Sequence, residues 1–265
     1  MTTLAYTLSD SRVMLRRNLK RQLRYPSMTV MLVAIPIVFL LLFVYVFGGQ
    51  LGAGLGAHKG RGAYLDYLVP GLLLMTVASV VQGTAIMVAM DMTGGIIDRF
   101  RTMAIARASV LTGHVLGSLM QTLVGTAILL AVALGLGFHS SAGPLQWLGA
   151  IGIVALFAFA LIWLGVALGL VAKSVETASN TPMFLTLLPF FGSGFVAPAT
   201  MPSGLRQFAE YQPFTPVTDA VRGLLTGGGG GDHAIAAVAW SVGIAIAAYL
   251  WAIRLYNQRR AAEPK

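Results

Sequence analysis

The sequence has very little charge for its length and no cysteine. Only 18 Lys and Arg and 9 Asp and Glu occur among 265 residues, which is 10% of the chain, whereas soluble domains carry about 25% charged residues. Since 57% of the residues are hydrophobic, there is too little polar surface to face water on all sides. The absence of cysteine excludes disulfides, thiolate metal sites and cysteine nucleophiles. These absences indicate an integral membrane protein.

Catalytic and nucleotide-binding motifs are missing as well. The sequence contains no H-E-x-x-H, no G-x-S-x-G and no G-x-x-x-x-G-K-[ST], the motifs of common zinc proteases, serine hydrolases and P-loop ATPases. The four histidines are scattered along the chain. We therefore expect no catalytic, metal or cofactor site, and no ATP bound by the chain itself. The net charge of +9 is explained by membrane topology, so no nucleic acid partner is expected.

Six apolar segments are long enough to be membrane helices, which need about 20 residues each. Their approximate bounds are Ser27–Phe47, Tyr67–Met90, Gly113–Phe138, Trp147–Ala172, Pro182–Ala199 and Ala234–Ile253. The sequence therefore predicts an all-α integral membrane fold in a single domain over residues 1–265. The uncharged run after Arg24 is too long for the apolar core of a signal peptide, so cleavage is not expected.

The distribution of Lys and Arg assigns the two sides of the membrane. With six spans, both termini lie on one side, together with the loop 91–112 and Lys173, and this side holds all but four of the basic residues. The other side holds Lys59, Arg61, Arg206 and Arg222. Because basic residues accumulate in cytoplasmic loops, we expect both termini in the cytoplasm and the protein in the cytoplasmic membrane.

Residues 1–26 contain a predicted amphipathic helix. Leu15, Leu19 and Leu23 recur every four residues and form one stripe, while the basic residues lie mainly off it. This pattern is typical of a helix in the cytoplasmic interface that contacts anionic lipid headgroups. A plain topology anchor is the compatible alternative. The predicted lipid-facing residues are Arg16, Arg17, Lys20, Arg21 and Arg24.

The loop 91–112 carries an unusual concentration of charge between two apolar spans. Ile97, Phe100 and Ala104 fall on one helical face, and polar residues lie largely on the other. A loop of this kind is typical of a docking helix, although a solvated loop that supplies positive charge is the alternative. The docking residues that we expect are Ile97, Asp98, Arg99, Phe100, Arg101 and Thr102.

The proline-containing stretch before the last span is too apolar for a solvated loop. It contains helix-like pieces around Leu205–Tyr211 and Val217–Leu225. Because non-helical backbone at membrane depth must be covered by protein or line a cavity, we expect residues 200–233 to form an extracellular re-entrant element that closes the bundle. The residues expected to be buried are Phe195, Val196, Leu205, Phe208, Phe214, Val217, Val221, Leu224 and Leu225.

The polar groups inside the spans are nearly all neutral. Gln82, Gln121 and Thr126 are candidate substrate contacts, with hydrogen bonds between helices as the alternative. The scarcity of ionisable residues in the spans disfavours an ion-coupled carrier. Gly165 and Gly169 have the spacing that allows close helix packing.

The order of these features resembles the ABC-2-type permeases, specifically the daunorubicin/doxorubicin-resistance exporters, over nearly the whole chain. The most specific segment is "FVAPATMPSGLRQFAEYQPFTPVTDAVRGLLTG", and "YLVPGLL" at the start of the second span also matches. Gln212 stands where the family usually has Asn, and Met103–Ala106 replaces a more polar stretch of the docking loop. The family positions in the first segment are Pro198, Pro202, Pro213, Thr215, Arg222 and Gly223, which we assign to an extracellular gate.

The resemblance implies a permease subunit that pairs with a second copy of itself and with two copies of a separate ABC ATPase, which would bind ATP and Mg. The loop after the second span would be the coupling helix that docks on the ATPase. The expected activity is export of an amphipathic drug, antibiotic or lipid-like substrate. The alternatives are export of a lipid-linked glycan, an ion-coupled carrier, and a membrane enzyme or assembly factor.

Overall fold

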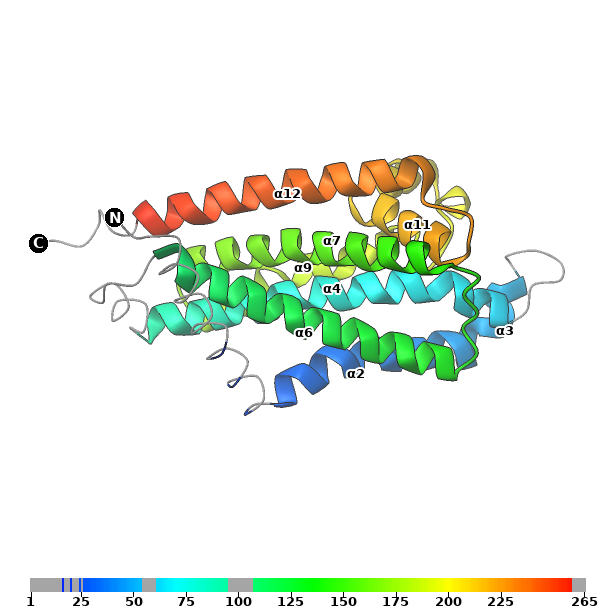
Figure 1. The fold of residues 1–265 in the computed structure, drawn as a ribbon, viewed down its shortest axis with the longest axis horizontal. Coiled ribbons are helices and arrows are strands. Elements are labelled where there is room, and N and C mark those ends of the chain that lie inside the picture. Colours follow the sequence, from blue (N-terminus) through cyan, green and yellow to red (C-terminus); the bar gives the residue numbers. More distant parts are fainter. Residues whose placement is uncertain are drawn as a thin grey trace, which may run out of the picture.

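The computed structural model describes residues 26–53, 61–94 and 107–258, together with positions 16, 20 and 24, and every regular element among them is a helix (Figure 1). The longest helices lie side by side along the long axis of the molecule. The first of them, α2, continues through a π-helical turn, Phe43–Phe47, into α3. These helices are α2 (Pro26–Leu42), α3 (Gly48–Ala53), α4 (Arg61–Thr93), α6 (Arg107–Gly135), α7 (Pro144–Val171) and α12 (Gly231–Gln258).

Five helical stretches are long and apolar enough to cross a membrane. They are Leu32–Gln50, Gly62–Thr93, Leu111–Gly135, Pro144–Val171 and Gly231–Tyr256. Each contains most of one predicted span, the first, second, third, fourth and sixth in chain order. The prediction of an all-α membrane fold is therefore confirmed.

The predicted fifth span, Pro182–Ala199, is not one continuous helix. The structure divides this region into α8 (Val175–Asn180), α9 (Met183–Leu187), a 3-10 turn at Leu188–Phe191 and another at Pro198–Thr200. Proline lacks the N–H that a continuing helix needs, so Pro182 and Pro189 interrupt the hydrogen-bond ladder. The apolar composition predicts a single membrane helix, but these prolines and the glycines that follow them divide the region into short helical pieces.

This region, residues 175–200, which we name the interrupted segment, still runs alongside α4. Gln82, in the second half of α4, donates to the Ser179 carbonyl at 2.9 Å. Near the start of α4, Gly71 lies against the backbone of Gly194. The chain from 179 to 194 therefore runs antiparallel to α4 between Gln82 and Gly71, although it is not a single helix.

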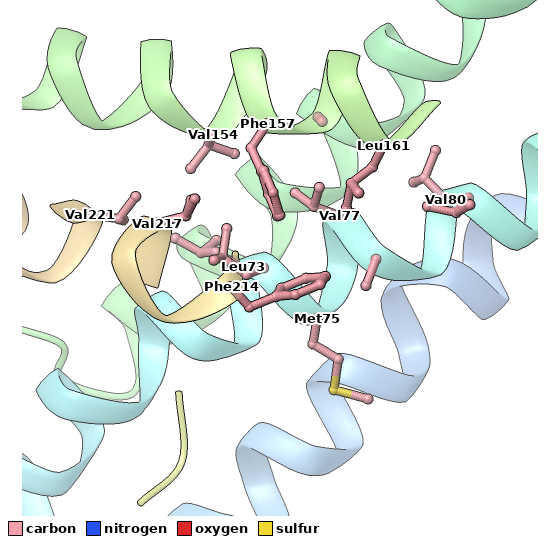
Figure 2. Packing of buried hydrophobic residues seen from close by; sticks show 14 of the residues in the cluster. Leu73, Met75, Val77, Val80, Val154, Phe157, Leu161, Phe214, Val217 and Val221 are labelled. Carbon is pink, nitrogen blue, oxygen red and sulfur yellow. The ribbon is translucent and has the colours of Figure 1, made fainter. Parts of the chain in front are cut away.

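The core is centred on α4 and α7. Within the candidate spans, 78% of α4 is buried but only 22% of α12, so α12 lies at the periphery. Figure 2 shows α7 side chains meeting those of α4 and of the short helix α11 (Phe214–Leu225). Phe157 and Phe214 pack edge to face with ring centroids 5.0 Å apart. The labelled core residues are Leu73, Met75, Val77, Val80, Val154, Phe157, Leu161, Phe214, Val217 and Val221.

Two glycines of α7 allow this close approach to α4. A Cβ at Gly165 would lie 2.8 Å from the Val81 carbonyl oxygen, and one at Gly169 would lie 2.7 Å from the Ala85 carbonyl oxygen. Real Cβ atoms do not approach backbone so closely, hence only glycine fits at this crossing. The predicted close packing at both positions is confirmed.

The helical pieces predicted before the last span are present as α10 (Ser203–Tyr211) and α11. They differ in burial. Phe195, Val217 and Val221 are buried as expected, but Leu205 is 38% and Phe208 48% exposed in the single chain. The expected burial of Leu205 and Phe208 is therefore wrong in the single chain, where only Ala209 of α10 is buried. Val196 is also exposed, at 40%.

Candidate functional site

All six residues predicted to form a gate lie at one end of the bundle, which we name the α11 end, where α4 and α7 begin (Figure 1). The three prolines each precede or open a helix: Pro198 opens the 3-10 turn, Pro202 precedes α10 and Pro213 precedes α11. Proline suits a helix start because its fixed φ is helical and its missing N–H would have no intrahelical partner there. The prolines therefore set the path of the chain, whereas the polar contacts come from other residues.

Arg222 is the centre of the polar contacts at the α11 end. Its guanidinium donates to the Ser193 carbonyl at 2.6 Å and to the Tyr67 carbonyl at 3.2 and 3.3 Å. It also pairs with Asp219, one turn earlier on α11. The guanidinium carbon lies 3.9 Å from the centre of the Tyr67 ring. We name Tyr67, Ser193, Asp219 and Arg222 the Arg222 clamp.

The other members of the clamp also bond to one another. The Tyr67 hydroxyl donates to the Ser193 carbonyl at 2.8 Å, and the Ser193 hydroxyl donates to an Asp219 carboxylate oxygen at 2.7 Å. Ser193 lies in the non-helical stretch that follows the 3-10 turn, and it is 2% exposed. The clamp thus supplies partners for backbone that has left its helix, which any such backbone at membrane depth requires.

A second set of contacts joins the same stretch to the start of α11. Thr215 donates to the Ala209 carbonyl at 2.5 Å and accepts from the Ser193 N–H at 3.2 Å. The Gln212 side chain donates to the Leu188 carbonyl at 3.1 Å. Gly192 lies beneath Gln212 and Thr215, where a Cβ would collide with both side chains. Thr215 is therefore a structural link between α10, α11 and the interrupted segment.

Close backbone contacts explain two further glycines at this end. A Cβ at Gly223 would collide with the Gly229 carbonyl oxygen, in the loop that leads to α12. A Cβ at Gly71 would collide with the backbone of Gly194. Together with the Arg222 clamp, these contacts fix α4, the interrupted segment and α11 against one another.

Three members of the clamp were not predicted as site residues. Tyr67 opens the quoted segment "YLVPGLL", and Asp219 lies three positions before Arg222, a spacing that places both on one helix face. Both signals could have been used. Ser193 has no comparable signal, because its role depends on where the interrupted segment meets α4 and α11.

The predicted coupling residues, Ile97, Asp98, Arg99, Phe100, Arg101 and Thr102, lie outside the described residues, as do Arg17 and Arg21 of the predicted interfacial helix. The remaining interfacial residues, Arg16, Lys20 and Arg24, are helical and exposed. Their four-residue spacing gives a basic face on a helix. Contact with lipid and with an ATPase stays a prediction.

The candidate substrate contacts come from two helices. Gln82, on α4, uses its amide group to bind both the carbonyl and the hydroxyl of Ser179, at 2.9 and 3.2 Å. Thr126, on α6, donates to carbonyls of its own helix. Gln121 lies half-buried on α6. At Gln82 the structure shows a hydrogen bond between two segments, which was the alternative to substrate contact. A role of the three residues in substrate passage stays a prediction.

The relatives found by comparison with known proteins are all ABC transporter proteins. The daunorubicin resistance ABC transporter permease of Streptomyces coeruleorubidus is 29% identical over 238 residues, 89% of this chain and 82% of the relative. A probable doxorubicin resistance ABC transporter permease of Mycobacterium tuberculosis is 23% identical over 214 residues, 81% of this chain and 76% of the relative. An ABC transporter G family member of Dictyostelium discoideum is 28% identical over 173 residues, 63% of this chain but 23% of that longer relative.

The part of the chain that matches a known family includes both the core of α4 and α7 and the Arg222 clamp. The ABC-2 type transporter family matches residues 10–226, from the predicted interfacial helix to the end of α11. This range includes every residue predicted to take part in the gate, in coupling and in substrate contact. Because the match extends over most of the chain, the protein belongs to the ABC-2 type transporter family.

Proposed function

We propose that the protein is the permease subunit of an ATP-driven exporter that moves an amphipathic drug or antibiotic out across the cytoplasmic membrane. The observation that carries this proposal is the similarity to a daunorubicin resistance permease along 89% of the chain. The sequence has no P-loop, so ATP and Mg would be bound by a separate ABC ATPase. A lipid-linked glycan is the alternative substrate within the same mechanism.

The proposed complex contains two permeases and two ATPases. The Lys and Arg distribution supports an α11 end that faces outward and both termini in the cytoplasm. In this arrangement the chain crosses the membrane six times, with the interrupted segment as the fifth crossing. The substrate would pass between two permease copies, and Gln82, Gln121 and Thr126 are the candidate polar contacts along its path.

The two ends of the bundle then have different tasks. The loop between α4 and α6, with Arg99 and Arg101, would dock on the ATPase and receive its motion. The Arg222 clamp would hold the outer gate, because it joins α4 to the interrupted segment and to α11. Outward opening would require these contacts to move as a unit or to break.

Reconstitution with the cognate ATPase tests the proposed function directly. We expect ATP-dependent uptake of daunorubicin into inverted proteoliposomes that contain both subunits, and no uptake with the permease alone. Daunorubicin uptake by the permease without an ATPase would refute the proposal. A glycan exporter would show daunorubicin-independent ATP hydrolysis and no drug uptake.

Charge reversal tests the coupling loop within that assay. We expect Arg99→Glu with Arg101→Glu to lower daunorubicin-stimulated ATP hydrolysis while membrane insertion is preserved. Arg254→Glu is the matched control, because this exposed residue near the end of α12 lies on the same predicted side but outside the loop. Unchanged stimulation in the loop variant, or equal loss in the control, would contradict docking at Arg99 and Arg101.

One observation favours an ion-coupled carrier as the second candidate. Asp91 and His114 form a buried pair, and carriers use ionisable groups within the membrane to couple transport to ions. Uptake that a protonophore abolishes while ATP is held constant would support the carrier. Uptake that follows ATP and resists the protonophore would support the exporter.

A further inference from the structure

A buried acid–base pair lies where α4 ends and α6 begins. His114 Nε2 is 3.2 Å from Asp91 Oδ2, and the two side chains are 3% and 1% exposed. Asp91 lies two residues before the end of α4, and His114 lies seven residues after the start of α6. The pair therefore bridges the two helices that flank residues 95–106, which belong to the predicted coupling loop.

A neutral hydrogen bond lies farther along the same helix contact. The Thr84 hydroxyl donates to the Ser118 hydroxyl at 2.9 Å, and both side chains are fully buried. Thr84 lies seven positions before Asp91 on α4, and Ser118 lies four positions after His114 on α6. Because the helices are antiparallel, both contacts join the same face of α4 to the same face of α6. We name the Asp91–His114 contact the acid–base rung and the Thr84–Ser118 contact the neutral rung.

The pair is costly to separate. A buried polar group that loses its hydrogen-bond partner keeps its desolvation penalty, and this applies to the His114 imidazole once Asp91 moves away. The second imidazole nitrogen, Nδ1, has no hydrogen-bond partner among the described residues, so Asp91 supplies the hydrogen bond that orients the ring. Sliding α4 past α6 by one helical turn, about 5.4 Å, would break both rungs at once. The two helices are therefore held in one register.

We propose that Asp91 and His114 are positioning residues that lock α4 and α6 into one rigid hairpin, so that force on the loop 95–106 moves both helices together. This inference rests on the proposed function, in which the loop receives the motion of the ATPase. It assigns to the pair a role in transmission and none in substrate contact. Without the lock, movement of the loop would be absorbed by sliding between the two helices.

A disulfide across the neutral rung tests whether the hairpin moves as one body. The chain has no native cysteine, so Thr84→Cys with Ser118→Cys places the only thiols. We expect copper-phenanthroline to cross-link them equally in nucleotide-free and ATP-bound complexes, and daunorubicin transport to continue after cross-linking. Loss of transport that a reductant restores would show that α4 must slide on α6, which overturns the proposal. Failure to cross-link would contradict the contact itself.

Substitution of the pair tests the lock by the ratio of transport to ATP hydrolysis. For Asp91→Asn and for His114→Gln we expect ATP hydrolysis per complex to continue, while daunorubicin transported per ATP falls at least about fivefold, the lower limit of typical coupling factors. The exchanged pair, Asp91→His with His114→Asp, should recover most of this ratio. A purely structural role would lower the amount of complex and leave the ratio unchanged, which would overturn the proposal.

The cross-link also separates this inference from the proposed function. In the permease without its ATPase, Asp91→Asn should lower the yield of the Thr84–Ser118 cross-link, and the exchanged pair should restore it. An unchanged yield in Asp91→Asn would refute the lock even if export is demonstrated. If the wild-type complex shows no ATP-dependent transport, the proposed function fails, and the yields still decide whether the pair holds the register.

Discussion

The two ends of α4 are held in different ways. At the α11 end, side chains bind backbone carbonyls of other segments: Arg222 binds the carbonyls of Tyr67, in α4, and Ser193, in the non-helical stretch, and Gln212 binds the carbonyl of Leu188, at the start of the 3-10 turn. Toward the other end, which we name the loop end, α4 packs closely on glycines of α7 and pairs side chain to side chain with α6. Where a helix is interrupted, polar side chains bind its backbone groups, and where helices continue, they are held by close packing on glycines and by bonds between side chains.

This difference fits the two proposed tasks. A gate needs contacts that can be exchanged, and hydrogen bonds between a side chain and a carbonyl can re-form with another partner or with water. A transmission element needs rigidity, which interlocked helix backbones provide because packed interiors deform little. Substitutions at the two ends should therefore differ in size and in what they change.

Loss of the Arg222 guanidinium should have the largest effect. Arg222→Ala leaves Asp219 and the carbonyls of Tyr67 and Ser193 without their shared partner, and we expect the free energy of unfolding to fall by about 3 kcal/mol. Arg222→Lys should recover only part of this, because an ammonium cannot reproduce the fork of donors. SDS unfolding in mixed micelles, followed by tryptophan fluorescence, measures the change.

Arg206 is the matched control for Arg222. It pairs with Glu210 one turn away on α10, but the two side chains are 50% and 42% exposed. Surface pairs of this kind contribute roughly 0.5 kcal/mol or less, so Arg206→Ala should change stability little. Equal effects at positions 206 and 222 would mean that the Arg222 clamp does not hold the α11 end.

We expect a methyl group to have opposite effects at two glycines of α7, Gly169 at the loop end and Gly152 nearer the α11 end. Gly169→Ala places a Cβ 2.7 Å from the Ala85 carbonyl oxygen and 2.9 Å from the Val88 Cβ, and such overpacking costs about 1–3 kcal/mol. Gly152 is exposed, with no atom within 4 Å of its Cβ position. Gly152→Ala should therefore be neutral or stabilise by up to about 1 kcal/mol. The same SDS titration compares them, and a like sign at both positions would contradict close packing as the cause.

The sequence was sufficient for features that depend on local pattern. Apolar length identified five helices, the spacing of Gly165 and Gly169 identified the helix crossing, and the predicted helical pieces Leu205–Tyr211 and Val217–Leu225 lie within α10 and α11. The interrupted fifth span was missed because apolar composition was given more weight than Pro182 and Pro189. Hydropathy measures the cost of leaving water and does not report whether the backbone ladder is continuous.

The candidate site was predictable only in part. Arg222, Thr215 and the prolines were identified from a family pattern, but the partners Ser193 and Tyr67 lie more than 20 positions away. The sequence around Ser193 does not indicate its role, because its contacts arise only where the interrupted segment packs against α11. The pair of Asp91 and His114 was overlooked for the same reason, since 23 positions separate two residues that each look like isolated span-end residues.

Gln82 gives a smaller and more specific test at the loop end. Gln82→Leu removes both hydrogen bonds to Ser179, and interhelical hydrogen bonds in membranes contribute about 0.6 kcal/mol on average. We expect a loss of that size in the free energy of unfolding and no change in the ratio of daunorubicin to doxorubicin transport. Thr126→Val, which affects bonds within one helix, is the control. A changed drug ratio in Gln82→Leu alone would place Gln82 in the substrate path.

Small effects should also come from the turn between α6 and α7, which distinguishes buried from exposed contacts at the α11 end. The hydroxyls of Ser140 and Ser141 donate to the carbonyls of Leu225 and Thr226 at 2.7 and 2.6 Å. These carbonyls terminate α11 and have no intrahelical partner. Water can replace the donor at the exposed Ser141 contact, so Ser141→Ala should cost less than about 0.5 kcal/mol. Ser140→Ala should cost about 1 kcal/mol, because its contact is partly buried. A reversed order would mean that water reaches the end of α11 from the side of Ser140, and that the polar contacts of this end are less protected than those of the Arg222 clamp.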